Sequence, residues 1–197
     1  MIESYLSLKT MRRQNPQSPH NALPKTENPW KETVQTVTLS LFLAFGIRTY
    51  VAEARYVPTG SMEPTIEIND RFMMDKLSYR WQDPHRGDIV VFTPPKVLLE
   101  QNMKDNLVKR LIGLPGDWVE VKNGRVSING TVLTESYTKE AAQYDMPAVT
   151  VPQHQYLMLG DNRNNSYDSH YWGFVPRENI VGRAWVRYYP FDRLGRF

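Results

Sequence analysis

The sequence predicts a mainly β domain built from antiparallel sheets, preceded by one N-terminal transmembrane helix. Two observations indicate this class. Residues 33–47 form a single uncharged run, and the chain after residue 56 consists of short apolar or alternating segments separated by turn residues. With 197 residues, the chain is long enough for one domain with a hydrophobic core. We therefore expect a mobile tail (1–30), an anchor helix (31–52) and a β-rich domain (53–197).

The N-terminal tail is polar and contains four prolines, which predicts a mobile segment: Pro16, Pro19, Pro24 and Pro29. The uncharged run that follows has fifteen residues. As a helix it would span about 22 Å of a hydrocarbon core that is roughly 30 Å thick. Because the Arg48 side chain can snorkel to the interface, residues 49–52 would extend the span. A buried core helix and an amphipathic helix on the bilayer surface are the alternatives.

Charge and composition limit the partners and the chemistry. Basic residues of the tail favour a cytoplasmic tail with the β-rich domain on the opposite side: Lys9, Arg12, Arg13, Lys25 and Lys31. The net charge is +3 with no run of basic residues, so no nucleic-acid partner is expected. The absence of cysteine excludes disulfides and a thiol nucleophile. The four histidines lack metal-ligand spacing, so neither a metal nor a cofactor is expected.

Several short strands are predicted after residue 56: Ile89–Phe92, Leu107–Ile112, Tyr156–Leu159 and Ile180–Tyr189. The segment WVEVKNGRVSI predicts a hairpin with Asn123-Gly124 in a type I′ turn. A second Asn-Gly at 129–130 indicates that the chain reverses again. Residues 134–152 are predicted to be a longer polar loop.

Ser61 is a candidate nucleophile because of the turn that surrounds it in YVPTGSMEPTIEI (56–68). Gly60 permits a sharp bend that a Cβ would obstruct, and Pro58 and Pro64 fix φ on either side. The serine is thereby predicted to lie at a rigid bend, presented with its own N–H free. An ordinary serine in a Pro/Gly turn is the alternative.

A serine nucleophile needs a base, and no histidine here completes a convincing Ser-His-Asp set. A lysine can serve where burial among apolar groups lowers its pKa and leaves it neutral. Lys109 lies in LVKRLIG, where it shares a strand face with Leu107 and Leu111, whereas Lys104 has polar neighbours. Lys109 is therefore the candidate base. The alternative is an edge-strand lysine that prevents aggregation.

A third region, GDNRNNSYDSHYWG (160–173), concentrates polar side chains beside two aromatic residues. Such a sequence indicates a hydrogen-bonded loop near a site, with a solvated surface loop as the alternative.

Together, four blocks in this order resemble the type I signal peptidase family. They are SMEPT (61–65), RGDIVVF (86–92), KRLIGLPGD (109–117) and GDNRNNSYDSHYWG (160–173). The resemblance extends over residues 33–190, and AEARYVPTGSMEPT is most similar to the cyanobacterial and plastid thylakoid branch. It implies the β-fold shared by signal peptidases and repressor autoproteases.

The resemblance also implies roles for particular residues. Ser61 would attack the scissile carbonyl, and neutral Lys109 would take its proton and pass it to the leaving amine. The Ser61 N–H and the Thr59 hydroxyl would form the oxyanion hole, where the family often has Ser at the position of Thr59. Arg110 is expected to be structural.

Three further residues would support this dyad. Ser166 would hydrogen-bond Lys109 and orient its amine, and Asp168 would support the Ser166 loop. His170 stands where many relatives carry Arg paired with the aspartate, and a neutral imidazole would make that pair weaker.

The implied function is that of a membrane-bound serine endopeptidase, which removes N-terminal signal peptides from exported preproteins after small residues. Shallow apolar pockets for those small residues would be lined by Val57, Pro58, Met62, Ile66, Leu107 and Val108. The implied partners are signal peptides of secretory preproteins and a lipid bilayer, with no nucleic acid, metal or cofactor. The expected location is the bacterial plasma membrane, with the catalytic domain (53–197) on the extracytoplasmic side. A thylakoid membrane with a lumenal domain is the alternative.

Two other functions compete with this hypothesis. A self-cleaving repressor-type protease shares the Ser-Lys dyad and a similar β-fold, but it predicts a helix-turn-helix where residues 1–30 are rich in proline. A non-enzymatic, membrane-anchored β module would use Ser61 and Lys109 only structurally.

Overall fold

The structure is a computed structural model that describes residues 29–197. The tail predicted for residues 1–30 lies outside the described residues, apart from Pro29 and Trp30. The chain divides into two compact units, one ending at Ser40 and the other spanning Leu41–Phe197.

Helix α1 spans Pro29–Tyr50 and coincides with most of the predicted anchor. Pro29 suits the first helical position because its missing N–H would have no partner there. No helix within residues 29–197 is both long enough and apolar enough to cross a membrane, so the predicted transmembrane helix (31–52) is not found. The reason is that Lys31, Glu32 and Arg48 confine the uncharged stretch to fifteen residues, which fall short of a hydrocarbon core of roughly 30 Å.

The larger of two antiparallel sheets has the strand order β1-β2-β11-β3-β4-β9-β10, with β12 paired to β11. Its strands are β1 (Ala52–Tyr56), β2 (Arg71–Asp75), β3 (Ile89–Phe92), β4 (Leu107–Gly113), β9 (Gln155–Leu159), β10 (Val175–Pro176), β11 (Ile180–Tyr189) and β12 (Gly195–Arg196). All four strands that the sequence predicts are present as β3, β4, β9 and β11. The mainly β fold class is therefore confirmed.

The smaller sheet has the order β7-β6-β5-β8. Its strands are β5 (Trp118–Lys122), β6 (Arg125–Ile128), β7 (Thr131–Val132) and β8 (Met146–Thr150). Asn123 and Gly124 have φ values of 51° and 77°, as the predicted type I′ turn requires. Asn129 and Gly130 reverse the chain again. Residues 134–152 are predicted to be a loop, but strand β8 lies within them, so the prediction is wrong for that part. Only Met146 of that strand is buried, so the segment has no apolar alternation and its pairing with β5 defines it.

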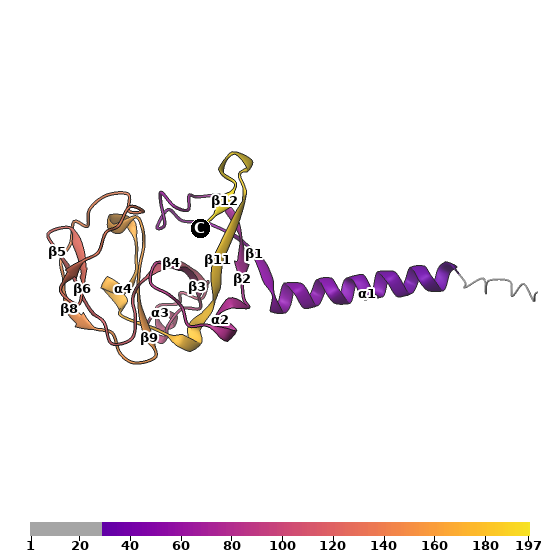
Figure 1. Ribbon diagram of the computed structural model, residues 1–197, viewed down its shortest axis with the longest axis horizontal. Coiled ribbons are helices and arrows are strands. Elements are labelled where there is room, and N and C mark those ends of the chain that lie inside the picture. The colour runs from indigo at the N-terminus through magenta and orange to yellow at the C-terminus, as the bar shows by residue number, and fades with distance from the viewer. Residues whose placement is uncertain (1–28) are drawn as a thin grey trace, which may run out of the picture. The chain divides into compact units, whose positions relative to one another are not determined.

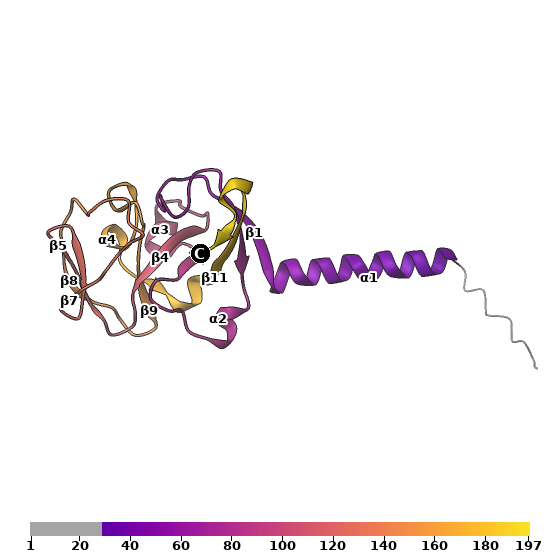
Figure 2. The ribbon, with the colours of Figure 1, turned by 45° about the horizontal axis from the view of Figure 1, so that its top comes forward.

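The remaining elements are short helices: α2 (Ser78–Trp81), α3 (Lys96–Glu100), α4 (Ser169–Trp172), η1 (Arg163–Asn165), η2 (Arg177–Asn179) and η3 (Phe191–Arg193). Within the β-rich unit, the smaller sheet lies at one end and β1 and β2 lie at the other, with β3 and β4 between them (Figures 1 and 2).

The segment between β1 and β2, which we call the nucleophile loop (residues 57–70), is anchored by apolar side chains. Val57, Met62 and Ile66 are buried in one cluster with core residues of the larger sheet: Phe72, Met74, Ile89, Val91 and Ala184. Burial of each large apolar side chain contributes about 1.5–3 kcal/mol. The loop is thereby fixed against the larger sheet, beside β4.

Candidate active site

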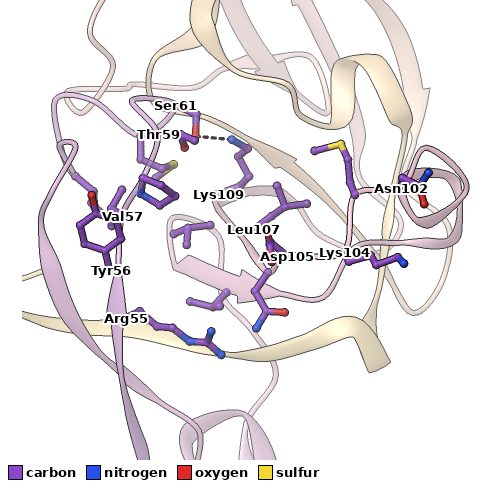
Figure 3. A pocket seen from close by; sticks show the side chains of 17 residues that line it. Arg55, Tyr56, Val57, Thr59, Ser61, Asn102, Lys104, Asp105, Leu107 and Lys109 are labelled. Atoms are coloured by element: carbon purple, nitrogen blue, oxygen red, sulfur yellow. Dashed lines mark hydrogen bonds between the residues drawn. The ribbon is translucent and has the colours of Figure 1, made fainter.

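The structure brings the two candidate catalytic residues into direct contact. Lys109 Nζ lies 2.6 Å from Ser61 Oγ in a hydrogen bond, although 48 positions separate them in sequence. Figure 3 shows this bond as a dashed line between the nucleophile loop and β4. A hydroxyl and an amine at this distance can exchange a proton directly.

Lys109 is suited to act as a base because it is buried. Its side chain belongs to β4, where it lies opposite Val90 of β3, and only 3% of its surface is exposed. Burial lowers the pKa of the Lys109 amine from 10.5 to about 8, while the nearby carboxylates of Asp168 and Asp161 act in the opposite direction. A substantial neutral fraction therefore exists in mildly alkaline solution.

Arg110, the neighbour of Lys109, anchors the site through a buried ion pair. Its Nε and Nη2 donate to Asp161 Oδ1 and Oδ2 at 2.8 and 2.6 Å, and its Nη1 donates to the Gly87 carbonyl at 2.8 Å. The Thr65 hydroxyl also donates to Asp161. Four chain segments, including the nucleophile loop, thus meet at one bidentate pair.

Asp168 and His170 lie together, in the pairing that the family resemblance implies for these positions. Asp168 Oδ2 accepts the Gly160 N–H at 2.8 Å, and Oδ1 lies 2.7 Å from His170 Nδ1. Asp168 also caps α4 by accepting the His170 N–H. Tyr144, which sequence reasoning missed, stacks on the His170 ring with centroids 3.9 Å apart.

Ser166 does not make the hydrogen bond that the resemblance implies. Its Oγ is buried but has no hydrogen-bond partner among residues 29–197, so the expected contact with Lys109 is absent. The hydroxyl instead packs closely against Gly160. The Lys109 amine bonds the Ser61 hydroxyl and not that of Ser166.

A cavity of about 550 Å³ opens beside Ser61 and Lys109. All six residues that the resemblance implies as pocket walls line it: Val57, Pro58, Met62, Ile66, Leu107 and Val108. Thr59 lines the same cavity near Ser61 (Figure 3). Among residues 29–197, neither the Ser61 N–H nor the Thr59 hydroxyl donates a hydrogen bond to another residue, and both residues line the cavity.

Sequence reasoning missed a second part of the cavity wall. Arg55, Tyr56, Val91 and the segment 102–106 complete the lining. The polar neighbours of Lys104 predict a solvated segment. Met103 is the apolar residue within this segment and is the signal that could have indicated a packed position. Among the described residues, no group of three or more His, Asp or Glu side chains is arranged to bind a metal ion.

Comparisons with known proteins agree with the resemblance. A family model described as "Signal peptidase, peptidase S26" matches residues 30–189. A probable signal peptidase I-2 of Synechocystis sp. is 56% identical, covering 86% of this chain and 78% of that protein. Signal peptidase I of Leptolyngbya laminosa is 52% identical, with coverage of 91% and 90%. Thylakoidal processing peptidase 1 of Arabidopsis thaliana is 41% identical, with coverage of 81% and 47%.

Cyanobacterial and thylakoidal peptidases are thus among the relatives, which confirms the branch that the sequence resembles. A family model that covers most of the chain agrees with relatives that are more than half identical. The chain belongs to the signal peptidase family, peptidase S26.

Proposed function

We propose that the protein is a serine endopeptidase that removes N-terminal signal peptides from exported preproteins by a Ser-Lys dyad mechanism. Family membership makes it a peptidase and hence a hydrolase. The observation that carries the proposed mechanism is the 2.6 Å hydrogen bond between Ser61 Oγ and the buried Lys109 Nζ, at the wall of an open cavity.

In the first half of the reaction, neutral Lys109 takes the hydroxyl proton of Ser61 while Oγ attacks the scissile carbonyl. The Ser61 N–H and the Thr59 hydroxyl stabilise the oxyanion of the tetrahedral intermediate. One such donor is typically worth roughly 3 kcal/mol. The protonated Lys109 then passes its proton to the departing amine, which releases the mature protein and leaves the signal peptide as an ester on Ser61.

In the second half, Lys109 is again neutral and takes a proton from water, which attacks the ester carbonyl. The proton returns to Ser61 Oγ as the ester bond breaks, and the signal peptide leaves as a free acid. A positioned base of this kind contributes about 10²–10⁴-fold in rate. Asp168 supports the dyad indirectly, because it accepts a hydrogen bond from the Gly160 N–H and pairs with His170. Ser166 contributes through its packing against Gly160.

The cavity supports a substrate with small residues before the cut. Its apolar walls offer shallow contacts that exclude larger side chains, which discriminates by about 1–3 kcal/mol per methylene-sized misfit. The cleavable segment would bind in an extended conformation and form backbone hydrogen bonds along a strand edge.

We place the reaction at the bacterial plasma membrane, with the catalytic domain on the extracytoplasmic side, and a thylakoid membrane with a lumenal catalytic domain as the alternative. Apolar side chains of α1 support lipid contact, since Leu41, Phe42 and Phe45 are each more than 60% exposed. Flotation of the full chain with vesicles that contain anionic lipid tests this placement. Protein that stays at the bottom of the gradient with and without salt would contradict it.

The catalytic proposal is tested by incubating the full chain with a preprotein in detergent and measuring the masses of the products. Ser61→Ala and Lys109→Ala should fold normally and release no signal peptide. Lys122→Ala is the matched control, because Lys122 is exposed on β5 of the smaller sheet. Unchanged processing by Ser61→Ala would favour the non-enzymatic β module instead.

A further inference from the structure

Asn162 forms two hydrogen bonds with consecutive carbonyl groups of the nucleophile loop. Its side-chain Nδ2 donates to the Gly60 carbonyl at 3.1 Å, and its backbone N–H donates to the Ser61 carbonyl at 3.2 Å. Asn162 is 3% exposed and lies 102 positions from Gly60 in sequence. The two carbonyls that it holds flank the nucleophile on the backbone.

Peptide geometry gives the first of these bonds a consequence for the oxyanion hole. The Gly60 carbonyl and the Ser61 N–H belong to one planar trans peptide, so they point in opposite directions. When Asn162 holds the carbonyl on its own side, the N–H must point away from Asn162. The Glu63 N–H donates to the same carbonyl at 3.2 Å and reinforces this orientation. Within residues 29–197 the Ser61 N–H donates to no acceptor, so it remains available to substrate.

The segment that carries Asn162 is itself held rigidly. Asp161 forms the buried ion pair with Arg110, the residue that follows Lys109 on β4. Gly160 packs so closely on the Ser61 carbonyl oxygen that a Cβ at this position would overlap it. One short stretch, residues 160–162, therefore contacts both the strand of the base and the peptide of the nucleophile.

We infer that Asn162 is a positioning residue, whose side-chain amide orients the Gly60–Ser61 peptide so that the Ser61 N–H faces the developing oxyanion. This inference rests on the proposed function of the same site. Because the oxyanion develops only as the bound substrate passes to the tetrahedral intermediate, and is absent from the bound substrate, losing this orientation should lower kcat and leave KM nearly unchanged. A misdirected donor should reduce kcat by about 10–100-fold, somewhat less than deletion of an oxyanion donor.

The test compares Asn162→Ala and Asn162→Asp with the control Asn164→Ala. Asn164 lies in the same loop, but its side chain bonds Ala141 and Gln143. Both Asn162 variants remove the amide donor, and Asp keeps the shape of the side chain. For each protein we would measure kcat, KM, the pH midpoint of the rate, the thermal unfolding temperature and the amide ¹⁵N–¹H resonance of Ser61.

We expect both Asn162 variants to lose kcat by about 10–100-fold with KM within about twofold and a displaced Ser61 amide resonance. The pH midpoint should be unchanged in Asn162→Ala, whereas the added carboxylate of Asn162→Asp favours the protonated Lys109 and should move the midpoint to higher pH. Asn164→Ala should match the wild type in all of these measurements. Folded Asn162 variants with wild-type kcat, or with an unmoved Ser61 resonance, would overturn the inference. So would a loss of kcat in Asn162→Ala that is accompanied by a matching rise in KM and a moved pH midpoint, because that result indicates general disruption of the site.

The two proposals can fail separately. If the wild-type chain cleaves no preprotein, the proposed function fails, yet the Ser61 resonance still decides whether Asn162 orients that peptide.

Discussion

Cleavage should rise with pH along the titration of Lys109, because only the neutral amine can accept the Ser61 proton. Burial lowers the pKa of this amine to about 8, and the Asp168 and Asp161 carboxylates limit the decrease. The rate should therefore increase as the pH passes 8 and level off above that value. Replacing Asp168 with Asn removes a charge that favours the protonated amine, so the midpoint should move to lower pH.

The magnitude follows from the fraction of neutral amine. With a pKa of about 8, this fraction is about 1% at pH 6, about 10% at pH 7 and about 90% at pH 9. Below pH 7, kcat/KM should rise about tenfold for each unit of pH, and above pH 9 it should change little. A solvated lysine with a pKa of about 10.4 would instead give a rate that still rises about tenfold between pH 8 and 9.

The assay measures initial rates on a preprotein between pH 6 and 10, with chemistry shown to be rate-limiting by single-turnover experiments. Lys122→Ala should reproduce the wild-type midpoint. The midpoint of Asp168→Asn does not depend on how much of that protein stays folded, so partial unfolding does not obscure it. A rate that is flat from pH 6 to 9, or one that climbs steadily to pH 10, would refute the assignment of Lys109 as a buried neutral base.

Three further changes probe the surroundings of the dyad. Thr59→Val removes a hydroxyl and keeps the shape, so kcat should fall about 100-fold with little change in KM, and unchanged turnover would assign the second oxyanion donor elsewhere. Gly160→Ala introduces a Cβ that overlaps the Ser61 carbonyl oxygen and Ser166 Oγ, so urea denaturation should show a loss of about 1–3 kcal/mol together with reduced turnover. Wild-type stability and turnover in Gly160→Ala would mean that residues 160–162 can shift freely. Asp161→Asn leaves the Arg110 charge buried without its partner and should lower the free energy of unfolding by about 3–5 kcal/mol. Glu100→Gln, which breaks the exposed pair with Lys96, should cost less than about 1 kcal/mol, and equal losses for the two variants would contradict the burial argument.

Local patterns in the sequence were sufficient for much of the fold. The turn residues at 123–124 and 129–130 placed the hairpins of the smaller sheet, because positive φ at Asn-Gly is a local steric preference. Apolar segments placed β3, β4, β9 and β11. The weakly apolar strand β8 and the short strand β1 left no such pattern. The uncharged run at 33–47 led to a wrong prediction of a transmembrane helix, because this run in α1 is too short to cross a membrane.

The immediate neighbours made Ser61 and Lys109 candidates, one by its turn and the other by its apolar strand, but left a structural alternative for each. The resemblance that assigns their roles came from contiguous blocks. Their 2.6 Å contact, the burial of the Arg110–Asp161 pair and the two bonds from Asn162 were decided only by the tertiary structure. Each of these contacts joins residues about 50–100 positions apart. Sequence periodicity reports only what a residue does within its own turn or strand. The pairing of side chains across the molecule depends on how the whole sheet packs.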